Sequence, residues 1–119
     1  MITRRLTTAL GAFAATALFA LAVPTSTAHA AECGVRSDGR LYCSNVVGAK
    51  GYADRSYRSA TRGTLTTGFN WFACWGHGDP HQGQNDIWYW TQLDNGQWGN
   101  VPAVSVGTGV DPAPGLREC

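Results

Sequence analysis

Four cysteines, Cys33, Cys43, Cys74 and Cys119, constrain this 119-residue chain more than any other feature. A domain of this size buries only a thin hydrophobic core, so covalent cross-links would supply much of its stability. The cysteines lack the paired C-x₂₋₄-C spacing of zinc sites. We therefore expect two disulfides, for which three pairings are possible.

The first thirty residues have the pattern of a secretory signal peptide. Arg4 and Arg5 give a basic start, residues 6–23 carry no charge, and Ala28-His29-Ala30 matches the small-x-small site that signal peptidase reads. A membrane anchor is the alternative, but the run is short and diluted with Ala, Thr and Gly. We expect cleavage after Ala30, secretion into an oxidising extracellular environment, and no stable membrane insertion afterwards.

A turn signal favours one of the three disulfide pairings. Ser37-Asp38-Gly39-Arg40 lies midway between Cys33 and Cys43, so a hairpin would bring these two cysteines together. Cys74 and Cys119 would then hold a tail rich in Pro and Gly against the body of the domain. We prefer Cys33–Cys43 with Cys74–Cys119 and leave the other pairings open.

Strand signals dominate the rest of the chain, and helix signals are almost absent. Short apolar, aromatic or alternating segments bounded by glycines predict strands at 41–47, 63–65, 69–75, 86–93 and 98–106. Alternation within 69–75 would place Trp71 and Trp75 on one face. Asp94-Asn95-Gly96 predicts a hairpin turn, and Pro102 an edge, bulge or break. Strands of this number and spacing suggest a small all-β barrel, followed by an irregular C-terminal tail from residue 107.

The charge balance narrows the classes of partner. The chain has 9 Lys and Arg against 8 Asp and Glu. Removal of residues 1–30 takes away Arg4 and Arg5 and leaves 7 − 8 = −1. A net charge so close to zero gives no general attraction to polyanions, so we expect no nucleic-acid partner.

The second half of the chain resembles a known family in three segments. They are Gly63-Thr64-Leu65, Trp88-Tyr89-Trp90 and the stretch NGQWGNVPA at 95–103, with a cysteine-bearing strand after the first. Together they resemble bacterial SH3-like (SH3b) domains, and the tail DPAPGL at 111–116 with the final cysteine resembles small secreted actinobacterial members. The chain departs from the family pattern at 52–60. The resemblance implies an SH3-like barrel over 51–119 that binds peptide or cell-wall material without catalysis.

Residues 31–50 have no counterpart in the plain SH3-like domain. We expect them to form an N-terminal disulfide-closed hairpin segment outside the barrel. The sequence shows no internal repeat that would indicate another domain. The expected organisation is therefore a signal peptide at 1–30, the hairpin segment at 31–50, and the barrel with its tail at 51–119.

Aromatic side chains are the preferred candidates for ligand contact. The five tryptophans together with Tyr89 are more than so small a barrel can enclose, and an exposed aromatic patch marks a contact site. The resemblance places the ligand groove beside the long first loop and gives Tyr57, Trp75, Tyr89 and Trp98 as ligand-binding residues. Aromatic surfaces bind sugars or proline-bearing peptides with little need of charge.

The segment His77-Gly78-Asp79-Pro80-His81 is the strongest candidate for metal binding. Two imidazoles and a carboxylate suit a divalent cation, but Asp-Pro is also a common turn and no fourth ligand is obvious. The chain has no G-x-S-x-G motif, and its cysteines are assigned to disulfides. We expect no metal, no cofactor and no enzymatic activity.

These observations predict a secreted, non-catalytic binding module with an aromatic groove. Its ligand would be a peptidoglycan-type peptide or glycan, or another extracellular protein. Two alternatives stay open. The chain could be an adaptor subunit of an extracellular assembly, docking through residues 31–50, or an inhibitor of an extracellular hydrolase that presents the loop at 77–83.

Overall fold

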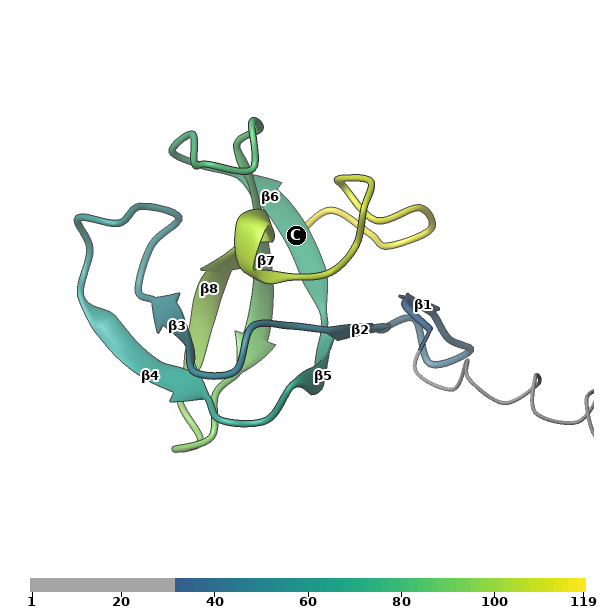
Figure 1. Cartoon of the computed structure of the whole chain (residues 1–119), viewed down its shortest axis with the longest axis horizontal. Helices are drawn as coiled ribbons and strands as arrows, with labels where there is room; N and C mark the ends of the chain where they lie inside the picture. Colours follow the sequence, from purple (N-terminus) through teal and green to yellow (C-terminus); the bar gives the residue numbers. More distant parts are fainter. Residues whose placement is uncertain (1–31) are drawn as a thin grey trace, which may run out of the picture. The chain divides into compact units, whose positions relative to one another are not determined.

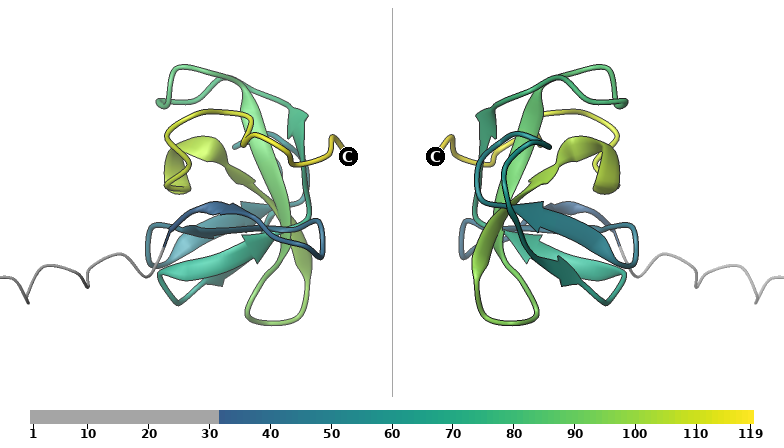
Figure 2. Two further views of the ribbon diagram at one scale, coloured as in Figure 1. Left: turned by 90° about the vertical axis from the view of Figure 1, so that its right-hand side faces the viewer. Right: turned by 90° about the vertical axis from the view of Figure 1, so that its left-hand side faces the viewer.

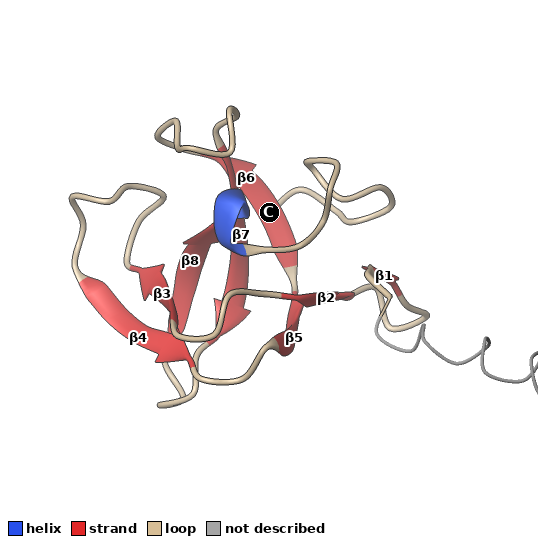
Figure 3. Ribbon diagram, viewed as in Figure 1, coloured by secondary structure: helices blue, strands red, loops and turns tan. Residues whose placement is uncertain are grey.

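Residues 32–119, the part of the chain that the computed structural model describes, contain eight β-strands and a short 3₁₀ helix (Figures 1 and 3). The expectation of an all-β fold is confirmed for these residues. The expected signal peptide at 1–30 lies outside the described residues. The elements are β1 (Gly34–Val35), β2 (Leu41–Ser44), β3 (Ala49–Tyr52), β4 (Thr61–Leu65), β5 (Phe69–Phe72), β6 (Cys74–His77), β7 (Ile87–Gln92), β8 (Trp98–Pro102) and η3 (Ala103–Ser105).

The strands form two antiparallel sheets. One has the order β1-β2-β5 and the other the order β4-β3-β8-β7-β6. Ala73 alone separates β5 from β6, and Figure 1 shows the two strands following one curved path between the sheets. Neither of these sheets is closed on itself, so the barrel expected from the sequence stays a proposal.

The break at Ala73 corrects one expectation about side-chain direction. The sequence predicted a single strand at 69–75 with Trp71 and Trp75 on the same face. Trp71 instead pairs with Tyr42 in the three-stranded sheet, whereas Trp75 pairs with Tyr89 in the other sheet and packs against the core. The strand ends at Ala73 because the chain changes sheets there, which breaks the alternation.

The hairpin of β7 and β8 lies where the Asn-Gly turn predicted it. Its register runs from Trp88 opposite Pro102 to Gln92 opposite Trp98. The Leu93 N–H donates to the Gln97 carbonyl at 2.7 Å, and Gly96 has a φ of +88°, which only glycine adopts without strain. Pro102 is the last residue of β8, and η3 begins directly after it. Its missing N–H therefore does not interrupt the hydrogen-bond ladder inside the strand.

A single core lies between the sheets. Alternation along β7 sends Ile87, Tyr89 and Thr91 inward and Trp88 and Trp90 to the outer face of the five-stranded sheet. Leu41 and Cys43, from the segment expected to lie outside the barrel, belong to this same core. Strand β3 also runs across the expected boundary at residue 50. Residues 32–50 are therefore built into the sheets.

The two preferred disulfides are confirmed. Cys33 bonds to Cys43 and Cys74 bonds to Cys119, with sequence separations of 10 and 45. The chain-entropy model assigns about 3 kcal/mol to the shorter closure and about 4 kcal/mol to the longer one. The first joins the ends of the β1–β2 hairpin, and the second attaches the tail to β6.

The tail has few regular hydrogen bonds of its own but covers the edge of β6. Trp75 donates its backbone N–H to the Arg117 carbonyl at 3.2 Å, and the Cys119 N–H donates to the Trp75 carbonyl at 2.9 Å. The Trp75 indole N–H also donates to the Leu116 carbonyl at 3.0 Å. The C-terminus lies beside β6 in Figure 1 and in both views of Figure 2. The tail thus blocks an edge that could pair with another chain.

A buried phenol fixes the start of this tail. Tyr89 has an exposed fraction of 0%; its hydroxyl donates to Asp111 Oδ1 at 2.6 Å and accepts the Ala113 N–H at 2.9 Å. Burial, reinforced by the hydrogen bond to Asp111, raises the pKa of Tyr89 well above its ordinary value. The phenol therefore keeps its proton and joins the tail to the core. No helix among residues 32–119 is long and apolar enough to cross a membrane.

We predict that Tyr89→Phe destabilises the oxidised domain by about 1–3 kcal/mol, because it leaves the buried Ala113 N–H without an acceptor. Tyr42→Phe is the matched control, since that hydroxyl donates to Asp38 at the surface. We expect the control to change stability by about 0.5 kcal/mol or less. Urea unfolding followed by tryptophan fluorescence measures both, and equal losses would contradict the role assigned to Tyr89.

Candidate ligand-binding site

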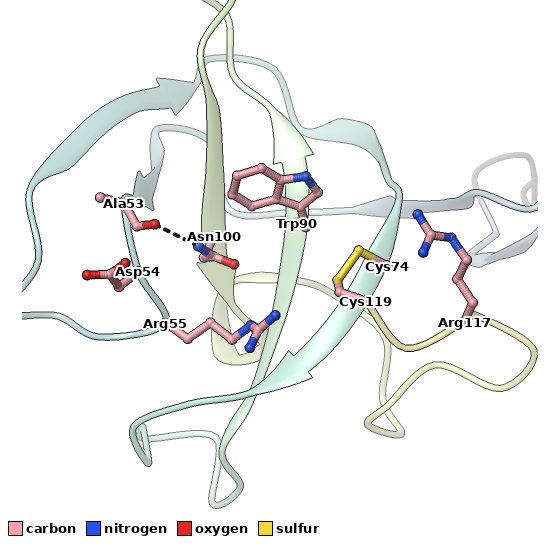
Figure 4. A pocket seen from close by; sticks show the side chains of 8 residues that line it. All are labelled: Ala53, Asp54, Arg55, Cys74, Trp90, Asn100, Arg117 and Cys119. Carbon is pink, nitrogen blue, oxygen red and sulfur yellow. Dashed lines mark hydrogen bonds between the residues drawn. A yellow bond between two sulfur atoms is a disulfide. The ribbon is translucent and has the colours of Figure 1, made fainter.

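A pocket of about 600 Å³ lies on the outer face of the five-stranded sheet (Figure 4). It is bounded by the loop after β3, by strands β6, β7 and β8, and by the C-terminal tail. We call it the sheet-face pocket. Its lining residues are Ala53, Asp54, Arg55, Cys74, Trp90, Asn100, Arg117 and Cys119.

Strand register builds the floor of the pocket. Cys74 lies opposite Trp90 in the β6–β7 pair, and Trp90 lies opposite Asn100 in the β7–β8 pair. The three side chains therefore form a row across the sheet on its outer face. The Asn100 amide donates to the carbonyls of Tyr52 and Ala53 at 3.3 and 3.2 Å, which holds its carboxamide in place.

The loop at 53–60 forms one wall. Its ends meet through a hydrogen bond from the Ala53 N–H to the Ala60 carbonyl at 2.8 Å. Inside the loop, the Ser59 hydroxyl accepts the Asp54 N–H at 3.0 Å and donates to the Ser56 carbonyl at 2.7 Å. The Asp79 N–H donates to the Arg55 carbonyl at 2.9 Å and ties this loop to the β6–β7 connection. These bonds fix the backbone from which Arg55 projects.

Arg55 extends over β6 into the pocket. Figure 4 shows its guanidinium directed toward the centre, whereas Asp54 points the other way. A Cβ atom on Gly76 would lie 2.5 Å from Arg55 Nε, and one on Gly78 would lie 2.5 Å from the Arg55 carbonyl oxygen. Gly78 therefore permits the close approach of the loop, and Gly76 leaves room for the end of the Arg55 side chain. Arg55 Nε is buried and has no hydrogen-bond partner within residues 32–119.

The tail forms the opposite wall. The disulfide of Cys119 with Cys74 holds it on the sheet, and Arg117 lines the pocket on the same side. Glu118 forms a parallel bridge with Trp75, and Arg117 and Cys119 lie on either side of it. Side chains two residues apart share a face, so the Arg117 side chain is on the same side of the sheet as the disulfide. The pocket thus has one arginine on each of its two walls.

Three tryptophans continue the surface beyond the pocket. Trp90 stacks on Trp98 with ring centroids 5.7 Å apart, and Trp98 meets Trp71 edge-on at 5.5 Å. All three are half-buried. We call them the tryptophan triad. The Arg40 guanidinium lies over the Trp71 ring, 4.0 Å from its centroid, so a cation–π contact extends the surface onto the three-stranded sheet.

The four aromatic residues proposed from the sequence do not come together. Trp98 belongs to the triad. Tyr57, with an exposed fraction of 45%, packs on Tyr52 and Trp88 and lines a separate hollow with Pro80, His81 and Gln82. Trp75 packs against the core, where the tail occupies its indole N–H. Tyr89 is fully buried, so it cannot reach a ligand in this structure, which corrects its assignment.

Arg55, Arg117 and Asn100 are the site residues that sequence reasoning missed. Their sequence signal is weak, because each lies far along the chain from the residues it faces. Gly76 and Gly78 are an indirect signal, since two glycines two residues apart, one in β6 and one just after it, leave room for another segment to lie on them. Trp90 lies in the strand predicted at 86–93 but is not among the four candidates from the resemblance.

The His77–His81 segment forms a braced turn. His77 Nδ1 lies 2.9 Å from Asp86 Oδ1, and this hydrogen bond lowers the pKa of Asp86. His81 Nδ1 accepts the Gly83 N–H at 3.1 Å, and its Nε2 lies 2.9 Å from the Ile87 carbonyl, so the bonds assign the Nε2–H tautomer. Across residues 32–119, no three His, Cys, Asp or Glu side chains are grouped to hold a metal ion.

We predict that Gly78→Ala destabilises the domain by about 1–3 kcal/mol, because the new methyl group overpacks the seat of the 53–60 loop. Its Cβ would meet the Arg55 carbonyl oxygen at 2.5 Å and Trp88 Cδ1 at 2.8 Å, and neither atom belongs to a flexible chain end. Gly34→Ala is the control, since nothing lies within 4 Å of its added Cβ. Thermal unfolding compares the two, and similar melting temperatures would contradict this packing.

Comparisons with known proteins identify no relative of this chain. No family model matches the chain, and neither a curated protein nor a solved structure does. The function is therefore argued from the site itself.

Proposed function

We propose that this chain is an extracellular, non-catalytic binding module whose ligand occupies the sheet-face pocket and the tryptophan triad. The observation that carries the proposal is the juxtaposition of three half-buried indoles with a pocket lined by arginines and a carboxamide. Tryptophan and arginine are the residues most enriched among the energetic centres of protein interfaces. A volume of about 600 Å³ falls within the range of ligand sites, roughly 300–1,000 Å³.

The covalent structure supports the extracellular part of the proposal. The small domain contains two disulfides. Disulfides persist in oxidising environments and are rare in the cytosol. The signal-peptide pattern at 1–30 points the same way. We also propose that the two sheets around one core are the SH3-like barrel implied by the sequence resemblance; the passage of one strand path from sheet to sheet at Ala73 supports this.

The chemistry of the lining residues favours binding over catalysis. A hydrolase needs a nucleophile or an activated water together with a proton acceptor in reach of it. The guanidinium groups of Arg55 and Arg117 have no acceptor site and the Asn100 carboxamide is not a base, so none of the three can take up a proton from a nucleophile. Asp54 supplies one lining carboxylate, and Figure 4 shows it directed away from Arg55 and the centre of the pocket. These groups are suited to hold a ligand.

The structure bears differently on the two alternative functions. The adaptor hypothesis rested on a hairpin outside the barrel, and residues 32–50 are instead part of the two sheets and the core. The inhibitor hypothesis has a specific observation in its favour. The β6–β7 loop is braced by hydrogen bonds from Gly78 to Asp86 at 2.8 Å and from His81 to Asn85 at 3.1 Å. A loop held rigid in this way loses little entropy on binding, and assays against secreted hydrolases test this second candidate.

We predict that Trp98→Ala weakens ligand binding by about 30-fold, the effect of losing one interface hot spot of about 2 kcal/mol. Trp90→Ala should act in the same direction. The measurement is co-sedimentation of the exported, oxidised protein with insoluble cell wall, together with fluorescence titration against soluble wall peptides, glycans and extracellular protein fractions.

Tyr57→Ala and Val104→Ala are the controls for this experiment. Both residues are exposed and lie outside the pocket and the triad. Each control should bind as the parent protein does. Melting temperatures identify any variant whose loss of binding comes from unfolding. Binding that survives both tryptophan substitutions, or is lost in the controls alone, would refute the proposed site.

A further inference from the structure

We infer that the sheet-face pocket binds an extended acidic peptide segment, with a carboxylate of that segment paired to Arg55. This inference rests on the proposed function and narrows it to one class of ligand. It is carried by the state of the Arg55 guanidinium, by the lack of an ion pair to either pocket arginine within residues 32–119, and by the row of arginines that continues past the tryptophan triad.

The Arg55 guanidinium has few of its hydrogen bonds made. It has five N–H donors in all. One contact, from Nη1 to the His77 carbonyl, is long at 3.5 Å, and Nε is buried without a partner among residues 32–119. Native structures leave few buried donors unsatisfied, so such a group calls for a physical explanation. A carboxylate that enters the pocket supplies two acceptor oxygens in the geometry that a guanidinium matches best.

Within the described part of the chain, neither pocket arginine forms an ion pair with a carboxylate. The one ion pair formed within residues 32–119 joins His77 to Asp86 on the β6–β7 loop. Asp54 is adjacent to Arg55 in sequence but points away from it (Figure 4). Arg117 stands on the opposite wall. An acidic ligand therefore meets two unpaired cations, one on each side.

Further arginines lie along the same surface. Arg40 rests on Trp71 and Arg36 rests on Tyr42, with guanidinium-to-centroid distances of 4.0 and 4.1 Å. Asp38 accepts hydrogen bonds from the Tyr42 hydroxyl and the Arg40 backbone N–H, so its carboxylate is bound to the hairpin turn. A guanidinium stacks on a ring by its face, so the N–H donors at its edge take no part in the stacking.

This arrangement of cations and indoles favours an extended peptide. The triad separates the pocket arginines from Arg40, so charge and apolar surface succeed one another along the face. In an extended chain, successive side chains project to opposite sides, so the side chains on one side recur about every 6.5–7 Å. A segment with acidic residues at alternate positions places carboxylates toward the arginines while its backbone and small side chains cover the indoles.

The test uses a fluorescein-labelled octapeptide in which Glu and Ala alternate, with a Gln–Ala octapeptide as the isosteric neutral probe. Anisotropy titration of the exported, oxidised protein should show at least tenfold tighter binding of the Glu peptide, and the difference should shrink as salt is added. Arg55→Gln should remove most of this preference. Arg58→Gln removes the same charge from an exposed arginine of the same loop and should leave affinity within about twofold.

A second variant separates position from charge. Gly76→Ala keeps every arginine, but its Cβ would lie 2.5 Å from Arg55 Nε and 2.6 Å from Nη2, which forces the flexible end of that side chain off the strand. It should lower affinity for the Glu peptide by about as much as Arg55→Gln does. Arg55→Lys retains charge without the bidentate fork and should give an intermediate loss. Melting temperatures show that each variant is folded.

The outcomes separate this inference from the proposed function. Equal affinity for the Glu and Gln peptides, or equal effects of Arg55→Gln and Arg58→Gln, overturns the acidic-peptide inference. If neither peptide binds while wall glycans bind in a Trp98-dependent manner, the inference fails and the proposed function stands. If no ligand class depends on Trp98, both fail.

Discussion

Attachment of the C-terminal tail to β6 and β7 is the constraint on which the domain depends. The Tyr89 hydroxyl holds the tail at Asp111 and Ala113, and the disulfide at Cys74 holds its end. Within this part of the tail, Ala113 and Leu116 close one side of the core. Hydrogen bonds with Trp75 then use the edge of β6 that an unprotected sheet would expose. The same attachment gives the pocket one of its walls, so the core, the sheet edge and the candidate site share one structural cause.

The loop at 53–60 divides the outer face of the five-stranded sheet into a covered part and an open part. Trp88 and Trp90 are two residues apart on that face, yet Trp88 has an exposed fraction of 0% and Trp90 is half-buried. Edge-on contacts with Tyr52 and Tyr57 cover Trp88, and its indole N–H donates to the Asp79 carbonyl at 2.9 Å. The loop thereby turns one tryptophan into a structural anchor and leaves its neighbour at the border of the pocket.

The sequence was sufficient for features that depend on neighbouring residues. The turn signal between Cys33 and Cys43 predicted their pairing, and Asn95-Gly96 predicted the β7–β8 turn. Alternation in the strand predicted at 86–93 also places Tyr89 on the opposite face from Trp88 and Trp90, but does not determine which face is the core. That choice depends on the tail, which supplies Asp111 to the Tyr89 hydroxyl from 22 residues away. The seat of Arg55 likewise depends on Gly76 and Gly78, which no local pattern connects to the loop.

The open surface combines groups that are costly to leave exposed or unsatisfied, and their arrangement limits that cost. Trp90 and Trp98 stack on each other, and Arg40 covers Trp71 with its guanidinium, so each ring loses part of its contact with water. Arg55 differs, because its buried Nε is left without a bond among the described residues. A carboxylate offers this guanidinium two acceptor oxygens and a negative charge, whereas a neutral amide of the same shape offers one oxygen and no charge. Selectivity for acidic ligands then follows from the second acceptor and the charge pairing.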